Sequence, residues 1–453
     1  MPRDLAPDVL ERFAKAFDAD PTARLLQNAV TKTQVDDVAL DRRVVTSIDH
    51  SVSHLLDDWG ATSQEKSGRC WLFAGTNLLR AGAAKKLGVK DFEFSQNHLL
   101  FFDKLEKANH WLESVIATAD RDVDDRTVAH LLATPSEDGG QWNMFVALVL
   151  KHGLVPKSAM PETASSSNTR QLNRDLATVL RQAARDLRAR AAAGALNEGL
   201  NEGLAEELAE AKEDVLGTVH RLLAIHLGTP PESFLWQWKD SDKGFHREGT
   251  MTPLEFADAY VTVPLADYVC LVNDPRPANP YGRTYTVEHL GNVVGAPPVT
   301  YLNVETDLMK SLASRAIAGG EPVWFGCDTG QMSNADLGLW DAGLYDRAAV
   351  YGTTPDLGKA DRLLHHESLM THAMLFTGVD LVDDVPRRWR VENSWGTEKG
   401  DKGFMTMNDN WFGEHVFEIA VRRDALPEDL RPALDAEPVV LPSWDPMGAL
   451  AGS

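Results

Sequence analysis

The stretch SQEKSGRCWLFAG, residues 63–75, most constrains what this chain can fold into. A polar segment containing Gly68 ends at Cys70, where an apolar helical pattern begins and continues to Gly88. We therefore expect Cys70 at the N-terminus of a buried helix. Two interpretations are open at this point. The cysteine is either structural core, or a thiol activated by the helix N-terminus with Gln64 as an amide donor upstream.

Composition and charge restrict the class of protein. The chain has 453 residues, of which 43% are hydrophobic and 25% charged, and this length allows two or three domains or one domain with large insertions. Its 67 acidic and 45 basic residues give a formal net charge of −22, which disfavours nucleic acid as a partner. Three cysteines do not suggest a disulfide framework, and neither a secretory signal nor a membrane-spanning run is visible. These features predict a soluble cytoplasmic protein with reduced thiols.

The hydrophobic periodicity predicts helices in the first half and strands in the second. Helical patterns cover residues 7–20, 70–87, 95–114 and 138–153, and Ser95 is a candidate N-cap. Residues 168–227 contain no proline and predict a helical insertion, whose leucine stripe at Leu196, Leu200, Leu204 and Leu208 packs on another element. A solvated helical hairpin without chemistry is the alternative for this insertion. From about residue 260, short β-branched and aromatic runs predict strands, so the fold class is α+β.

Residues far apart in the sequence supply the parts of a thiol-based catalytic centre. His372 leads a strand-like run, and Asn393 ends another, WRVENSWG, just before Trp395. The Asn393 carbonyl can accept the Nδ1 proton of His372 and fix its tautomer, while the indole shields that bond. The Gln64 amide and the Cys70 N–H can converge as an oxyanion hole, with Gly68 permitting the turn.

Other candidate groups favour ordinary structural roles. Cys270 and Cys327 lie in apolar strand-like runs and are expected to be inert core thiols. The pair His365-His366 has no second ligand pair at a suitable spacing, so no metal site is predicted, and nothing in the sequence calls for a cofactor.

The order Gln-x5-Cys-Trp, a distant His, then Asn-Ser-Trp-Gly resembles the papain-like cysteine peptidases. In ordinary members, His and Asn follow the Cys by about 130–150 residues, whereas His372 lies 302 positions after Cys70. That separation resembles the branch of bleomycin hydrolases and aminopeptidases C. Further motifs of this branch occur in the same order along nearly the whole chain: SQNHLLFFDKLEKANHWLE, DGGQWNMF, GLVPKSAMPET, EPVWFGCD, LGLWDAGLYD and LPSWDPMGALA.

The resemblance implies a role for each matched residue. Cys70 is expected to be the nucleophile, His372 the base, Asn393 the residue that orients it, and Gln64 an oxyanion donor. Gly139 and Gly140 are expected to form a strand edge that pairs with the substrate backbone.

The resemblance also implies a two-lobed fold, with a helical lobe, an antiparallel β-barrel-like lobe, a helical insertion and two arms. The expected divisions are an N-terminal arm for oligomerisation at 1–62, a helical catalytic lobe at 63–160, the helical insertion at 161–260, a β-rich catalytic lobe at 261–436 and a C-terminal arm in the cleft at 437–453. A homohexamer is expected. An arm in the cleft would block the subsites for residues before the cleaved bond, although Gly452 and Ser453 would displace its carboxylate.

The function expected from these residues and this resemblance is that of an intracellular thiol aminopeptidase acting on peptides. A papain-like endopeptidase is the alternative if the arm does not occupy the cleft. A non-catalytic cage or binding scaffold that keeps the fold is the alternative from another class.

Overall fold

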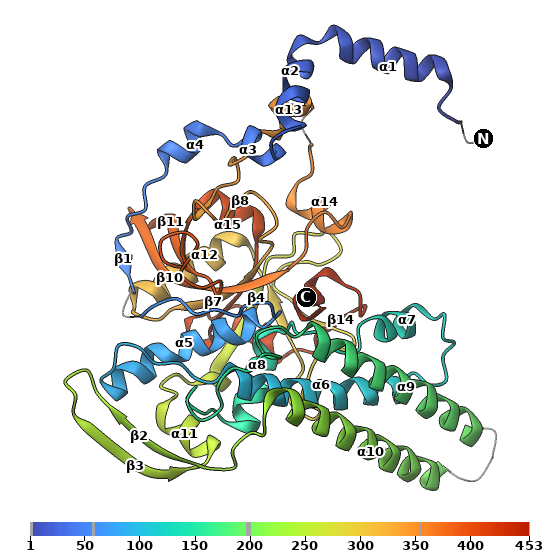
Figure 1. Ribbon diagram of the computed structural model, residues 1–453, viewed down its shortest axis with the longest axis vertical. Coiled ribbons are helices and arrows are strands. Elements are labelled where there is room, and N and C mark those ends of the chain that lie inside the picture. Colours follow the sequence, from blue (N-terminus) through green and yellow to red (C-terminus); the bar gives the residue numbers. More distant parts are fainter. Residues whose placement is uncertain (1–2, 57–58, 196–200, 354, 453) are drawn as a thin grey trace.

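The computed structural model describes residues 3–56, 59–195, 201–353 and 355–452 (Figure 1). A mixed sheet lies at the centre, with helices on both of its faces. The N-terminal segment runs outside this body as a chain of short helices, and its first helix extends away from the rest. These helices are α1 (Pro7–Ala19), α2 (Pro21–Val30), α3 (Val35–Ala39) and α4 (Arg42–Ser47).

Four helices cover one face of the sheet: α5 (Cys70–Leu87), α6 (Gln96–Ala117), α7 (Arg126–Ala133) and α8 (Trp142–His152). The prediction for α5 is confirmed at both ends, since it begins at Cys70 and stops at Gly88, whose φ of 68° is left-handed. Ser95 caps α6 as predicted, because its hydroxyl accepts from the His98 N–H at 3.0 Å. Helix α8 starts four residues later than expected, so residues 138–141 form a loop.

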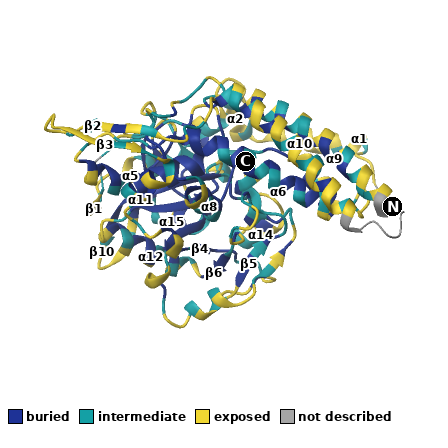
Figure 2. Cartoon of the chain, turned by 90° about the horizontal axis from the view of Figure 1, so that it is seen from below, coloured by how far each residue is buried: buried dark blue, intermediate teal, exposed yellow. Residues whose placement is uncertain are grey.

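The insertion holds two long helices, α9 (Arg170–Ala195) and α10 (Asn201–Leu227), which pack on each other and on α6. Their outer faces are exposed while their inner faces are buried (Figure 2). Leu208 is buried and Leu204 packs against the core, whereas Leu196 and Leu200 lie outside the described residues. The predicted packing of the leucine stripe is therefore confirmed at Leu204 and Leu208, and the exposed outer faces agree with a helical hairpin that is solvated on one side.

A hairpin that the sequence analysis did not expect follows these helices. Its strands, β2 (Phe234–Lys239) and β3 (Phe245–Met251), project from the body, and α11 (Pro253–Tyr260) returns the chain to it (Figure 1). Segment 161–260 is therefore not wholly helical. The two strands pair in an antiparallel ladder, and aromatic rings stack on it, with the Trp236 and Trp238 rings 5.3 Å apart and the Trp238 ring 4.9 Å from the His246 ring.

The central sheet has the strand order β14-β5-β6-β4-β13-β7-β10-β11-β12-β9-β8, with β1 (His54–Leu55) pairing on β10. Six strands lie where the sequence predicted them: β4 (Tyr268–Val272), β7 (Val323–Cys327), β10 (His372–Val382), β11 (Val385–Glu392), β12 (Phe404–Asn408) and β13 (Val416–Arg422). Five short strands were not predicted: β5 (Thr284–Val287), β6 (Tyr301–Asn303), β8 (Ser333–Asn334), β9 (Leu339–Trp340) and β14 (Val439–Leu441). The α+β expectation is confirmed, and the barrel-like closure stays a prediction.

Each face of the sheet has its own hydrophobic core. One core joins α5, α6 and α8 to the first face, and the other packs α12 (Thr306–Ala318) and α15 (Asp409–His415) on the second. Two further short helices, α13 (Arg347–Tyr351) and α14 (Lys359–Leu364), lie in the connections between strands. Helix α5 lies against β10, and its first residue, Cys70, contacts Ala373, the second residue of β10. No helix within the described ranges is long and apolar enough to span a membrane.

Candidate active site

Cys70 is the first residue of α5 and is only 2% exposed. Its sulfur accepts a hydrogen bond of 3.4 Å from the backbone N–H of Ala373 on β10. Burial raises the pKa of the Cys70 thiol to about 11, although the N–H groups of Ala373, Trp71 and Cys70 itself act in the opposite direction. The helix N-terminus therefore favours the thiolate as expected, but it does not lower the pKa of the isolated thiol below its ordinary value.

His372 begins β10, one residue before the backbone N–H that contacts the sulfur. Its Nε2 lies 2.9 Å from Oδ1 of Asn393, the residue that follows β11. The predicted partnership is present, but the prediction that Nδ1 makes this bond is wrong. Because the adjacent strand end presents Asn393 to Nε2, the Nε2–H tautomer donates this bond and Nδ1 carries the unprotonated lone pair.

The environment of the imidazole disfavours its charged form. Burial lowers the pKa of His372 to about 4, and the Asn393 hydrogen bond offsets this only in part. The Trp395 ring lies 5.1 Å from the His372 ring and remains 37% exposed, so it covers the imidazole on its solvent side. Burial therefore disfavours the charged form of each side chain, the thiolate of Cys70 and the imidazolium of His372.

Gln64 is buried and is held on the side of Asn393 by Ser394. The Ser394 hydroxyl donates to Gln64 Oε1 at 2.6 Å, and the Gln64 backbone N–H donates to the Ser394 carbonyl at 2.8 Å. The amide Nε2 donates one hydrogen to the Ser67 carbonyl and retains a second. Together with the Cys70 N–H, which has no acceptor within the first helical turn, this second hydrogen can form an oxyanion hole.

Gly68 was expected to permit the turn between Gln64 and Cys70, but the left-handed residue in this turn is a different one. Glu65, not Gly68, has a positive φ, of 53°. A non-glycine residue in this conformation carries strain, which persists only where neighbouring contacts fix it. Here Ser63 supplies local contacts, since its hydroxyl donates to the Glu65 carboxylate at 2.8 Å and accepts from the Glu65 N–H at 3.3 Å.

Gly139 and Gly140 lie in the loop before α8, not in a strand, and both are buried. A Cβ on Gly140 would come within 2.5 Å of the Trp71 ring, so this position requires glycine. The Gly139 carbonyl accepts from Lys107 Nζ. The expected strand edge is therefore absent at residues 139–140, and their pairing with a substrate backbone stays a prediction.

The C-terminal segment passes close to this loop. After β14 it forms a 3₁₀ helix, Pro446–Gly452, in which Met447 and Leu450 are buried. The Met447 carbonyl accepts from the Tyr301 hydroxyl at 3.1 Å and from Gln141 Nε2 at 3.4 Å. A cavity of about 330 Å³ separates this segment from α6 and α7, and Leu369, three residues before His372, lines it as well.

The thiols of the other two cysteines donate hydrogen bonds to oxygen acceptors. Cys327 donates to the His372 carbonyl at 3.7 Å, and Cys270 donates to the Asn143 side chain at 3.1 Å. Burial raises the pKa of both well above the ordinary value. Within the described parts of the chain, no group of three or more His, Cys, Asp or Glu side chains is arranged to hold a metal ion.

Sequence reasoning missed several residues that shape the site. Ser394 was visible in the Asn-Ser-Trp-Gly motif, and Arg69 lies directly before the nucleophile candidate, so both had a local signal. Asp138 opens the motif DGGQWNMF, but the sequence does not reveal that its carboxylate accepts from the Gly68 N–H at 2.9 Å and pairs with the buried Lys104 at 2.8 Å.

Known proteins are similar to this chain over nearly its full length. A sequence model of the peptidase C1-like family matches residues 4–448. Bleomycin hydrolase of Homo sapiens is 42% identical over 446 residues, covering 96% of both chains, and aminopeptidase C of Streptococcus thermophilus is 42% identical over 448 residues, covering 99% of both. The crystal structure of PepW from Lactobacillus rhamnosis HN001 superimposes with a TM-score of 0.95 at 41% identity, covering 99% of both chains.

Proposed function

Because this chain belongs to the peptidase C1-like family, we propose that Cys70, His372, Asn393 and Gln64 are the working residues of a cysteine aminopeptidase. The chain is a papain-like thiol aminopeptidase, as its relatives named bleomycin hydrolase and aminopeptidase C indicate. The observation that carries the residue assignment is the junction of α5 with β10. There the Cys70 sulfur contacts the backbone beside His372, and His372 is in turn hydrogen-bonded to Asn393.

The acylation half of the reaction begins with transfer of the Cys70 proton to Nδ1 of His372. The thiolate attacks the carbonyl carbon of the first peptide bond, and the carbonyl oxygen becomes an oxyanion. The Cys70 N–H and the free Gln64 amide hydrogen donate to that oxyanion. When the intermediate collapses, the C–N bond breaks, His372 gives its proton to the leaving amine, and a thioester remains on Cys70.

Deacylation uses the same residues, with His372 now acting first as a base toward water and then as an acid toward the leaving thiolate. Neutral His372 takes a proton from water, and the resulting hydroxide attacks the thioester carbonyl. Collapse expels the Cys70 sulfur, which regains the proton from His372, and the N-terminal amino acid leaves as a free acid. Asn393 keeps Nε2–H in place through both halves, so that Nδ1 is always the nitrogen that carries the moving proton.

We further propose that the C-terminal segment, residues 437–453, limits the enzyme to N-terminal residues. Its buried anchors, Met447 and Leu450, and its contact with Gln141 beside the Gly139-Gly140 loop support a position along the cleft. A segment in that position would obstruct any substrate that has more than one residue on the N-terminal side of the cleaved bond.

The decisive test compares a fluorogenic aminoacyl amide that has a free α-amine with the same compound carrying an N-acetyl group. The proposal predicts hydrolysis of the free amine only, and acquisition of activity on the blocked compound when the chain is truncated before Met447. Faster hydrolysis of the blocked compound by the full chain would favour the endopeptidase alternative. Absence of hydrolysis of either compound under reducing conditions would favour the scaffold.

The remaining parts of the proposal concern organisation. We propose two catalytic lobes at 63–160 and 261–436, the latter closing in a barrel-like manner, with the insertion at 161–260 between them in sequence. The N-terminal arm at 1–62, with its exposed Leu10, Phe13 and Phe17 on α1, is the proposed contact for a hexamer. Three free cysteines support a reducing compartment such as the cytoplasm.

A further inference from the structure

Arg69 is a fully buried arginine directly before Cys70, and the proposed mechanism does not use it. Its guanidinium forms a two-pronged pair with Glu162, with Nη1–Oε1 at 3.0 Å and Nη2–Oε2 at 2.8 Å. Its remaining nitrogen, Nε, donates to the Ser67 hydroxyl at 2.8 Å. The central carbon of the guanidinium lies 5.1 Å from the centre of the Phe73 ring. The guanidinium therefore has hydrogen-bond partners at its three nitrogens and an aromatic ring packed on it.

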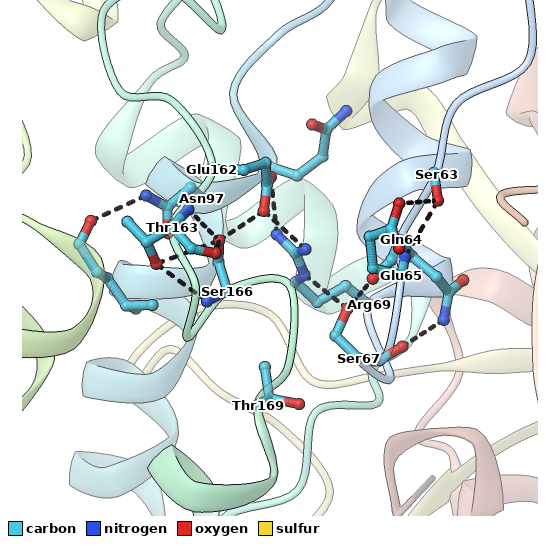
Figure 3. A network of polar contacts seen from close by, with 12 residues as sticks. Ser63, Gln64, Glu65, Ser67, Arg69, Asn97, Glu162, Thr163, Ser166 and Thr169 are labelled. Carbon is cyan, nitrogen blue, oxygen red and sulfur yellow. Dashed lines mark hydrogen bonds and ion pairs between the residues drawn. The ribbon is translucent and has the colours of Figure 1, made fainter. Parts of the chain in front are cut away.

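The Ser67 hydroxyl transmits this contact to Gln64 (Figure 3). It accepts from Arg69 and donates to the Gln64 backbone carbonyl at 2.6 Å, while the Ser67 carbonyl accepts from Gln64 Nε2. Arg69 therefore contacts a residue, Ser67, that bonds both the main chain and the side-chain amide of Gln64, as Ser394 does from elsewhere in the chain. Because hydroxyl groups rotate freely, a charged donor on the oxygen is needed to direct the Ser67 proton toward the Gln64 carbonyl.

The partner carboxylate belongs to the segment that opens the helical insertion. Glu162 also accepts from the Ser166 hydroxyl at 2.6 Å (Figure 3). The Ser167 carbonyl accepts from the Lys66 N–H at 3.0 Å. Thr169 donates to Asp138, which accepts from the Gly68 N–H. Residues 162–169 thus contact the loop 64–69 directly at two points, Arg69 and Lys66, and at a third, Gly68, through Asp138.

The geometry points to Arg69, held by Glu162, as a positioning residue for the Gln64 oxyanion donor. This inference rests on the proposed roles of Cys70 and Gln64. The left-handed Glu65 next to Gln64 would relax if the loop were free, and the Arg69–Ser67 contact opposes that relaxation. Lysine cannot substitute, because a single ammonium cannot reproduce the planar fork that binds Glu162 and also donate from Nε to Ser67.

The test separates oxyanion stabilisation from thiol reactivity by measuring two reactions of one variant. Hydrolysis of a free-amine aminoacyl amide forms an oxyanion, whereas alkylation of Cys70 by iodoacetamide displaces iodide at a saturated carbon and forms none. For Arg69→Lys we expect kcat to fall about 10-fold to 100-fold, part of the 10²–10³ that an oxyanion donor supplies, with KM and the alkylation rate within about 2-fold of wild type. A free-amine aminoacyl aldehyde, whose hemithioacetal oxygen occupies the same site, should bind more weakly by the same factor as kcat.

Two further variants guard against misfolding and against a general effect of arginine loss. The double variant Arg69→Met/Glu162→Met leaves no unpaired buried charge and should show the same split between hydrolysis and alkylation. Arg362→Lys changes another largely buried arginine, which pairs with Glu414 at 2.7 Å away from this loop, and should leave both rates within about 2-fold of wild type.

Three outcomes would overturn the inference. One is hydrolysis by Arg69→Lys at the wild-type rate, and another is a parallel fall in hydrolysis and alkylation, which would place the effect on the thiol or on the whole fold. The third is wild-type enzyme that still hydrolyses substrate after Cys70 is fully alkylated. That last outcome would overturn the proposed function as well, and it is recognised without any Arg69 variant.

Discussion

Cys70 and Cys327 are two buried thiols that contact the first residues of β10, yet only Cys70 has the surroundings of a nucleophile. Cys70 accepts from the Ala373 N–H, whereas Cys327 pairs with His372 in the β7–β10 register and donates to the His372 carbonyl. Burial raises the pKa of both thiols. For Cys70 three backbone N–H groups oppose that effect, whereas for Cys327 the charges of Asp328 and Cys70 add to it.

This difference shows that nearness to a histidine does not by itself activate a thiol. Cys327 lies beside the backbone of His372, and its sulfur has only a carbonyl to contact. Cys70 lies at the N-terminus of a helix. Backbone N–H groups there can stabilise negative charge on the sulfur and then on a substrate oxygen. The predictions below test this contrast, in order of decreasing effect.

The largest expected effect comes from removing each thiol in turn. Cys70→Ala should reduce kcat/KM at least about 10⁴-fold, as loss of the nucleophile does in other acyl-transfer enzymes. Cys327→Ala and Cys270→Ala should stay within about 3-fold of wild type. Steady-state hydrolysis of a free-amine aminoacyl amide measures all three, and comparable losses for Cys70→Ala and Cys327→Ala would remove the basis of the contrast.

The next effect comes from the residue that orients the imidazole. Asn393→Ala removes the acceptor for the His372 Nε2–H, so the ring can turn and present the wrong nitrogen to the thiol. We expect kcat to fall about 10-fold to 100-fold, a part of the 10²–10⁴ supplied by general acid–base catalysis. Asn334→Ala, which removes an amide on β8, is the matched control. A loss below 2-fold in Asn393→Ala would contradict the orienting role.

A smaller effect is expected in the pH profile. Burial lowers the pKa of His372 to about 4, and Trp395 contributes to that burial. Trp395→Ala admits water to the ring, which favours the imidazolium and raises the pKa of His372 toward its ordinary value. The acid limb of kcat/KM should therefore move to higher pH by about 1 unit, while Trp238→Ala in the β2–β3 hairpin should leave it in place. An acid limb that does not move, or moves to lower pH, would contradict the shielding role.

The smallest effect concerns stability at the third thiol. Cys270 lies beside Glu418, which is fully buried, and neither oxygen of its carboxylate has a hydrogen-bond partner in the described part of the chain. Burial raises the pKa of Glu418 to about 8, above its value in the unfolded chain. The folded state therefore binds the proton more tightly, and its stability declines as the pH rises from about 4.3 to 8.

Glu418→Gln removes this titration without adding a charge. We expect the variant to gain a few degrees in Tm relative to wild type at pH 8 and much less at pH 5. Glu428→Gln, at an exposed position, is the control and should show no such dependence on pH. An equal or smaller gain at pH 8 than at pH 5 would show that Glu418 is not held in its protonated form.

Much of the fold and the site could be predicted from local sequence. The apolar helix after Cys70, the Ser95 cap and the strands that carry His372 and Asn393 each have a periodicity or a motif. The short strands β5, β6 and β14 have none, because tertiary pairing rather than local propensity makes them strands.

The features that the sequence did not reveal depend on contacts between distant residues. The pairing of Arg69 with Glu162 spans 93 positions, and the choice of Nε2 over Nδ1 depends on where a neighbouring strand ends. The left-handed conformation in the turn before Cys70 falls on Glu65, whereas the sequence analysis looked to Gly68 to permit that turn, because glycine is the most permissive residue. In each case the local sequence favoured a simpler arrangement than the folded chain has.

The central claim is that Cys70, alone among the three buried thiols, is the nucleophile. The most direct measurement is peptide mapping by mass spectrometry after the folded enzyme reacts with a free-amine aminoacyl chloromethyl ketone. The account predicts one adduct per chain, on Cys70, with hydrolytic activity falling in proportion to its formation and Cys270 and Cys327 unmodified. Loss of activity with the adduct on Cys327 or Cys270, or with Cys70 unmodified, would contradict it.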